Sequence, residues 1–596
     1  MYVMFIENIN NKKDFPLPMP LNNLKKPLVS LVICALVIFF GPSSQASEDK
    51  VASLMPVIML LLEDDSADEI DMASASRFLM QATYGPTLDE ITALTNSSYE
   101  AWIENQFALP VTNHIEYGLD IGFFRTPNTI FQGPVPGRNH RYSVWNHVAM
   151  NAPDQLRQRM AFALSQIFVV SDRAIPSHSI ITRYYDLLVE NAFISYRELL
   201  EKVALNQFMG RFLGMAGNQR ANPDLNIIRP DENFAREIMQ LFSIGLVELE
   251  LDGTPKLDAN GNQIPTYAQS DVEELAKVFT GWHLEFISDA TFDQTNRGLD
   301  NRYLGPMRAF ANFHDVSSKT LLNVPGFNSV IPPNQTAEQE LEQTLDILAN
   351  HPNTAPFISK QLIQRFVTSN PTPAYVRRIS TVFNNTDGDL QAVVKAILLD
   401  TEARQGHLRN PETFGKIKEP VLKLTGFWRG VGLLLNVPFA GPSARSFEQM
   451  EQAPLTAPSV FNFFRPDFSP QGVLSENGLF SPESQLLTST SIVTMGSTLS
   501  DLSLTSNQAQ NPNSATFTAI ATDHLEALVP DDLVRPEALV EHLNIVLLAG
   551  SMTDEMREVL LDLHSGSDGY AASSKLNVVN DILYLITLSP DFNVQR

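Results

Sequence analysis

The chain has 596 residues, of which 67 are acidic and 42 are basic, so its formal net charge is −25. Hydrophobic residues make up 44% of it, which is enough for a sizeable core, and the acidic excess argues against a protein that binds nucleic acid through its phosphates. The single cysteine, Cys34, excludes structural disulfides and sites with several cysteine ligands.

The N-terminus has the pattern of a secretory signal peptide. Two lysines precede an apolar run at 28–40, and small residues up to Ala46 follow it. The run is too short to span a bilayer, which takes about 20 residues. We therefore predict a signal peptide over 1–46, an exported protein in the periplasm or outside the cell, and no stable membrane span after cleavage. An uncleaved anchor is the alternative, and translation could start at Met1 or at Met19.

The rest of the chain predicts a mainly α fold, a large multi-helix domain with a small β-hairpin insertion. Residues 47–72 are predicted to be a linker, because their apolar stretch is short and contains a proline, with a strand-like tail as the alternative. Beyond it, apolar residues recur with helical spacing. We predict one large helical domain over 73–596.

Individual helices are predicted from this spacing and from capping residues. The clearest cover 154–170, 232–244 and 270–282. Four capping boxes, in which a Ser or Thr precedes a Glu or Gln by three residues at the start of a helix, are predicted to begin at Thr87, Ser97, Ser270 and Thr336.

Two segments interrupt the helical pattern. Residues 247–267 alternate between apolar and polar and contain Asp-Gly and Asn-Gly pairs, which predicts one or two β-hairpins. Residues 501–532 are rich in Ser, Thr, Asn and Ala and have little periodicity, which predicts a flexible surface loop.

Several motifs in a fixed order resemble a bacterial family called domain of unknown function 1800. The motifs are RFLMQATYGP at 77–86, DENFAREIMQLF at 231–242 with Gly245, Asp271 and Val272 before TGW at 280–282, FHD at 313–315 with Lys319, HP at 351–352 before APF at 355–357, and SPDF at 589–592. The resemblance covers about residues 73–596. It implies an exported, mostly helical protein with no known activity.

The resemblance also implies a partner and shows one departure. Members of this family are often encoded beside another exported family, domain of unknown function 1501, whose protein is therefore a candidate partner. The family usually carries a His-Pro pair before the motif at 231–242, where this chain has Asn206 and Gln207. If that histidine were a metal ligand or a proton shuttle, this chain has lost it.

Glu237 and Arg236 are the first candidate catalytic residues. Glu237 borders the apolar face of helix 232–244, where a carboxylate must be paired or have its pKa raised. It could serve as a general acid or base or as a metal ligand. The alternative is a buried Glu–Arg clamp that fixes helix packing.

His314 and Asp315, followed by Lys319, are the second candidate pair. Adjacent His and Asp side chains can bind a divalent metal or form an acid–base pair. The alternative is a loop in which Asp315 caps the next segment and pairs with Lys319. If Glu237, Arg236, His314 and Asp315 form one site, they should share one hydrogen-bonded network.

The sequence leaves two functions open and assigns no cofactor or metal. The first is a non-catalytic binding or assembly protein that acts with the co-exported partner. The alternative is a hydrolase that acts on an envelope or extracellular polymer through Glu237, Arg236, His314 and Asp315. The replaced His-Pro pair favours the first.

Overall fold

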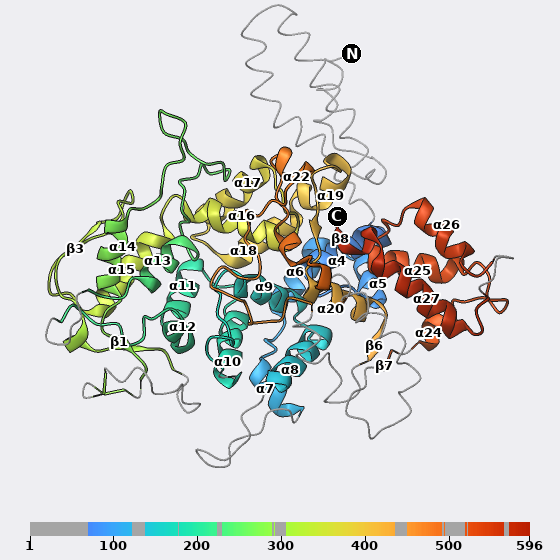
Figure 1. Ribbon diagram of the computed structural model, residues 1–596, viewed down its shortest axis with the longest axis horizontal. Coiled ribbons are helices and arrows are strands. Elements are labelled where there is room, and N and C mark those ends of the chain that lie inside the picture. Colours follow the sequence, from blue (N-terminus) through green and yellow to red (C-terminus); the bar gives the residue numbers. More distant parts are fainter. Residues whose placement is uncertain are drawn as a thin grey trace, which may run out of the picture. The chain divides into compact units, whose positions relative to one another are not determined.

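Helices dominate the described part of the chain, as the spacing of its apolar residues predicts (Figure 1). Helix accounts for 54% and strand for 5%, so the prediction of a mainly α fold is confirmed. The computed structural model describes residues 70–121, 138–176, 178–222, 229–285, 287–288, 291–292, 305–434, 450–491, 494, 519–520, 522–565 and 571–596.

Residues Asp71–Arg596 pack into one unit. The predicted signal peptide, 1–46, lies outside the described residues, as does the predicted linker up to residue 69. None of the helices in the described part of the chain combines the length and the apolar character that crossing a bilayer requires.

The first helices begin where local side chains cap them. The capping box of Thr87 and Glu90 forms as predicted, whereas the next helix is capped by Ser98 and not by Ser97. In the described residues before position 213 the helices are α4 (Met72–Ala82), α5 (Leu88–Thr95), α6 (Tyr99–Ala108), α7 (His114–Asp120), α8 (Arg138–Asn151), α9 (Gln155–Ser165), α10 (His178–Glu190), α11 (Tyr196–Ala204) and α12 (Gln207–Phe212).

Helix α9 is buried on all sides. Its spacing of apolar residues predicts one buried face, but residues 155–164 are all buried, including Arg159. The guanidinium of Arg159 donates to the carbonyl of Arg365, so the polar side chain is bonded in the interior. Helices α4, α6, α8, α10 and α16 contact α9.

The middle of the chain forms a second set of helices. They are α13 (Asn233–Gln240), α14 (Gln269–Val278), α15 (Ala337–Ala349), α16 (Thr354–Phe366), α17 (Pro373–Asn385), α18 (Leu390–Leu399), α19 (Thr401–Arg409) and α20 (Pro420–Gly430). Figure 1 shows α13, α14 and α15 side by side, and α14 contacts both of the others. Helix α14 begins one residue before the predicted Ser270, because Asp271 accepts a hydrogen bond from the amide of Ala268.

The C-terminal helices pack against the first helices of the unit. They are α22 (Val473–Glu476), α24 (Asp523–Glu526), α25 (Glu537–Leu548), α26 (Asp554–Asp562), α27 (Lys575–Leu588) and α28 (Pro590–Asn593), and there are two short 3-10 helices, η4 (Ala311–Phe313) and η5 (Pro482–Leu486). Helix α25 contacts both α4 and α20, so the two ends of this unit pack together (Figure 1). Much of the predicted loop 501–532 lies outside the described residues, and its described part contains α24 and one strand.

Strands are short and pair in antiparallel twos. The pairs are β1 (Trp282–His283) with β2 (Arg308–Ala309), β3 (Lys319–Thr320) with β4 (Val330–Ile331), β5 (Lys416–Ile417) with β8 (Val594–Gln595), and β6 (Leu433–Leu434) with β7 (Ala519–Ile520). Within the predicted hairpin segment, isolated bridges join Val247 to Pro265 and Leu257 to Gln263. Its turn glycine Gly261 has φ +83°, as an Asn-Gly turn requires.

Candidate functional site

His314 lies directly after η4 and packs against the turn that follows α14. Gly281 forms this turn with φ +80°, and a Cβ there would lie 2.9 Å from the backbone nitrogen of His314. The amide of Phe310 also donates to the carbonyl of Gly281 at 2.7 Å. A glycine is therefore required for this close approach, which brings the TGW and FHD motifs together.

His314 and Lys319 meet on a buried glutamate, Glu340, that comes from α15. Nδ1 of His314 lies 2.9 Å from the carbonyl oxygen of Thr280, and its Nε2 lies 3.3 Å from Oε2 of Glu340. The ammonium of Lys319 donates to Oε1 of Glu340 at 2.8 Å. All three side chains are at most 1% exposed, and we call them, with Asp315, the His314 network.

Asp315 joins the same network at its edge. Its backbone amide donates to the hydroxyl of Thr280 at 2.8 Å, and the backbone carbonyl of Asp315 accepts from Lys319 at 2.6 Å. Burial alone would raise the pKa of the Asp315 carboxyl, but the hydroxyl and amide of Ser317 and the charge of Lys319 lower it. Asp315 therefore stays ionised, as the capping-loop alternative requires.

Glu237 lies on α13 with its side chain inside the protein. It is 6% exposed, and one of its oxygens, Oε2, has no hydrogen-bond partner among the described residues. Burial raises the pKa of Glu237, while the charge of Arg236 opposes this shift. A carboxyl group in this state carries a proton more readily than an exposed one.

Arg236 does not form the predicted clamp with Glu237. Its guanidinium donates to Glu232 at 3.2 Å and to the amide oxygen of Gln269 at 3.1 Å. The predicted clamp between Arg236 and Glu237 is therefore wrong. Arg236 instead forms its ion pair with Glu232, one turn closer to the start of α13, and its side chain is part-exposed there.

The four predicted residues thus fall into two places. Among the described residues, no hydrogen bond or ion pair joins Glu237 or Arg236 to His314 or Asp315. The condition stated for a single site, one shared hydrogen-bonded network, therefore does not hold among the described residues. Their separation in the sequence left this contact unconstrained. Arg236 bonds to Glu232 and Gln269, whereas His314 bonds to Thr280 and lies beside Glu340.

Glu340 is the residue of the His314 network that sequence reasoning missed. It lies between Ala337 and Leu341 on the face of α15 that Thr344 and Leu348 also share, so helical spacing alone places it inside. A carboxylate on an apolar helix face needs a buried cation, and Lys319 was the available one.

No group of three or more His, Cys, Asp or Glu side chains in the described ranges is arranged to hold a metal ion. Where the resemblance implies a His-Pro pair, Asn206 caps α12 by accepting from the amides of Phe208 and Met209. Gln207 donates to the carbonyl of Gly305 at 2.6 Å. Both side chains serve the local structure.

A second buried network surrounds Glu419, immediately before α20. Its Oε2 accepts from the amides of Gln166 and Gln452, each at 2.6 Å. Lys416 lies 3.7 Å from Glu419 and 3.0 Å from Glu483. Burial alone would raise the pKa of Glu419, but Lys416 and two buried arginines lower it. Here too a buried lysine faces carboxylates.

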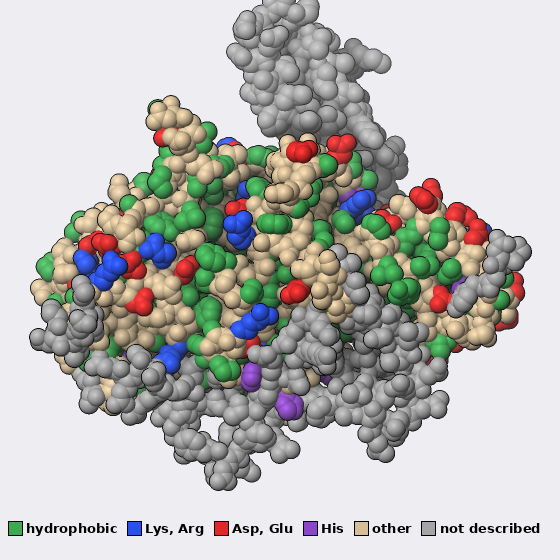
Figure 2. Space-filling view, viewed as in Figure 1, with side chains coloured by type: hydrophobic (Ala, Val, Ile, Leu, Met, Phe, Trp, Pro, Cys, Tyr) green, Lys and Arg blue, Asp and Glu red, His purple; other side chains and the backbone are tan. Residues whose placement is uncertain are grey.

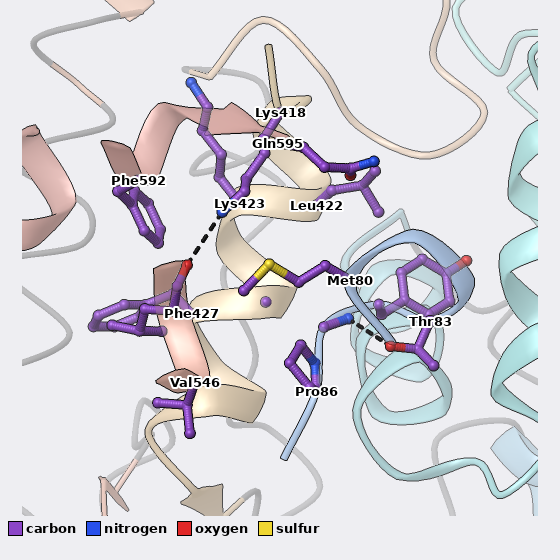
Figure 3. Close-up of a pocket in the computed structure, with 14 residues that line it drawn as sticks. Met80, Thr83, Pro86, Lys418, Leu422, Lys423, Phe427, Val546, Phe592 and Gln595 are labelled. Atoms are coloured by element: carbon purple, nitrogen blue, oxygen red, sulfur yellow. Dashed lines mark hydrogen bonds between the residues drawn. The ribbon is translucent and has the colours of Figure 1, made fainter. Parts of the chain in front are cut away.

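A cavity lies between the loop after α4, helix α20 and the C-terminal helices (Figure 3). Its enclosed volume is about 30 Å³, which is room for one or two water molecules. Gly85, with φ +119°, lets the loop approach α20, because a Cβ there would collide with the Cα of Gly426. The apolar side chains that line it include Met80, Pro86, Leu422, Phe427, Val546 and Phe592.

Two lysines also line this cavity, and the sequence analysis did not single them out. Lys418 is 8% and Lys423 3% exposed. Burial lowers the pKa of Lys418 to about 7, with a contribution from Lys423, and burial lowers the pKa of Lys423 to about 8. Helical spacing could have indicated that Lys423 is buried, because it shares the face of α20 that holds Pro420 and Phe427.

Comparison with known proteins identifies a family but assigns no function. Residues 77–594 match the family described as "Protein of unknown function (DUF1800)". No curated protein and no solved structure matches the chain significantly.

Proposed function

Since the chain belongs to the DUF1800 family, a membership that carries no activity with it, we propose from its own side chains that it is a non-catalytic binding or assembly protein. In this proposal the chain is exported through its N-terminal signal and acts with a co-exported partner. The partner implied by the resemblance is a protein of the domain of unknown function 1501 family.

The burial of the His314 network carries this proposal. A general acid or base must come within hydrogen-bond reach of its substrate, directly or through one water. His314 is 1% exposed and Glu340 is 0% exposed, and their charged and polar atoms face Lys319 and Thr280. Side chains bonded in this way hold α14, α15 and the β3 segment together, which supports a structural role.

A direct binding measurement tests the proposal. The exported chain and the domain of unknown function 1501 protein encoded beside it would be purified separately and titrated by isothermal calorimetry. We expect saturable binding, and a complex of defined mass in size-exclusion chromatography with light scattering. Absence of binding at concentrations well above typical interface affinities would contradict the proposal.

Glu237 favours a second candidate function, a hydrolase that acts on an envelope or extracellular polymer. A carboxyl group with a raised pKa and a free oxygen can act as a general acid. The test is polymer cleavage by the wild type and by Glu237→Gln and Glu232→Gln variants. Activity that only Glu237→Gln abolishes would support the hydrolase, and absence of cleavage by the wild type would count against it.

A further inference from the structure

A surface groove lies between helix α15 and the loop that precedes β4. Its volume is about 440 Å³, within the usual range of ligand sites, and it is open to solvent. We call it the α15 groove. The residues that line it are Phe327, Asn328, Gln339, Glu342, Gln343 and Asp346. The groove therefore has room for a long side chain and offers it two carboxylates and an aromatic ring.

An arginine from a neighbouring helix holds the two carboxylates in place. Arg197 lies on α11, which contacts α15 (Figure 1). Its Nε donates to Asp346 at 2.7 Å, and one terminal nitrogen donates to Glu342. The other terminal nitrogen donates to Glu201 at 2.6 Å. One positive charge thus faces three negative charges, so an excess of negative charge remains at the groove.

The loop side of the groove is apolar and is also fixed. The ring of Phe327 is 37% exposed, and Val330 in the strand that follows is exposed as well. The side-chain amide of Gln343 donates to the carbonyl of Asn328 at 2.7 Å, and the backbone amide of Phe327 donates to that of Val324 at its carbonyl oxygen, at 3.1 Å. Because both sides are held before anything binds, binding orders few groups of this chain.

We propose that the α15 groove receives an arginine side chain of the co-exported partner. In the complex its guanidinium lies against the ring of Phe327 and donates to Glu342 and Asp346 at the oxygens that Arg197 leaves free among the described residues. A guanidinium is planar, stays charged and stacks on aromatic rings, so it suits this groove better than an ammonium group does. The identity of the partner rests on the assembly role proposed above.

Three labelled decapeptides test the ligand class on the full exported chain by fluorescence anisotropy. They are repeats of Gly-Arg, of Gly-Lys and of Gly-citrulline, in which citrulline keeps the shape of arginine without its charge. We expect the arginine peptide to bind saturably and about threefold or more tighter than the lysine peptide, and the citrulline peptide not to bind measurably. No saturable binding of the arginine peptide, or equal binding of either other peptide, would overturn the proposal.

Variants with a matched control test the residues. Glu342→Gln with Asp346→Asn removes two charges at part-exposed positions, so stability should change little. The control removes the same charge from exposed positions of α26, by Asp554→Asn with Glu555→Gln. We expect the groove variant to weaken binding of the arginine peptide about tenfold and Phe327→Ser about threefold, whereas the control leaves it unchanged. Equal weakening by the two double variants would reveal only a general attraction to an acidic chain and would overturn the proposal.

A titration with the co-exported partner separates this proposal from the assembly role. We expect the Glu342→Gln/Asp346→Asn variant to bind that protein about tenfold more weakly than the wild type does. If both bind it equally well, the assembly role stands and the groove is not its interface. If that protein does not bind while the arginine peptide binds at the groove, the arginine site is supported and the assembly role with that partner fails.

Discussion

The buried charged side chains of this protein fall into two groups, those that face a buried group of opposite charge and those that do not. Lys319 and Lys416 each face a buried carboxylate, and these contacts join separate helices or segments. Glu237 and the two cavity lysines have no such partner among the described residues, and burial shifts their pKa values toward the neutral form. The first group is expected to matter for stability, and the second to make stability depend on pH.

Glu340→Gln should destabilise the protein strongly. The substitution keeps the shape of the side chain but removes the charge that the ammonium of Lys319 faces at 2.8 Å. Loss of one partner of a buried pair costs about 3–5 kcal/mol, which urea unfolding measures. The matched control is Glu338→Gln, an exposed position in the first turn of the same helix, with an expected change within about 0.5 kcal/mol. Equal effects of the two changes would show that the His314 network does not hold α15.

The cavity lysines should make stability depend on pH. The pKa of Lys418 is lowered from 10.5 to about 7 in the folded chain, so between these values the unfolded chain binds more protons. Stability therefore rises as pH increases through this window. We expect the melting temperature of the wild type, relative to that of Lys418→Met/Lys423→Met, to rise from about pH 7 to about pH 9. Parallel pH curves for the two proteins would contradict this.

Glu237→Gln separates the remaining interpretations of that residue. Because Arg236 pairs with Glu232 and not with Glu237, removal of the Glu237 charge breaks no ion pair. Its pKa is raised in the folded chain, so the charged form opposes folding at neutral pH. We expect the melting temperature to stay the same or rise slightly, measured by differential scanning calorimetry. A clear fall would show that the Glu237 carboxylate has a stabilising partner.

At the scale of elements, turns bring the motifs together. Gly281 and Gly261 have almost the same φ, +80° and +83°. A Cβ on Gly281 would meet the backbone of His314 and Phe310 at 2.9 Å, whereas nothing lies within 4 Å of a Cβ on Gly261. The first glycine is therefore needed for packing and for φ, and the second for φ alone.

Alanine substitutions at these glycines form a matched pair. Gly261→Ala should cost about 1–2 kcal/mol, the usual penalty for an L-residue in the left-handed region. Gly281→Ala should cost clearly more, because the backbone it meets cannot move without displacing His314. Urea unfolding of both variants gives the comparison, and equal costs would mean that the TGW turn adapts.

Sequence reasoning succeeded where a local pattern decides the structure. The box at Thr87, the turn at Gly261 and the helical class all follow from spacing within one element. It failed where distant elements decide: spacing could not show that Arg159 is bonded inside or that Lys418 meets the C-terminal helices. The candidate site was likewise predicted only in part. His314 and Asp315 were recognised from their motif, but Glu340 comes from another helix, and no local pattern links it to them.

At the scale of the whole molecule, the positive charge that one face displays is not gathered into one patch (Figure 2). On the face drawn in Figure 2, Lys and Arg side chains lie singly or beside Asp and Glu, with no continuous cationic patch. With a net charge of −25, long-range electrostatics oppose approach to a polyanion.

Export is a prediction about the whole chain, and cleavage leaves a chemical signature. Cleavage after Ala46 would remove Cys34, the only cysteine, so the mature protein should begin near Ser47 and contain no thiol. A chain without cysteine cannot form wrong disulfides in an oxidising compartment. We expect the exported protein, unfolded in denaturant, to give no reaction with a thiol reagent and an intact mass that starts near Ser47. An Ala46→Leu variant, whose cleavage site has a large residue, should retain one reactive thiol. A cytoplasmic wild-type chain with its thiol intact would show that residues 1–46 are not a signal peptide.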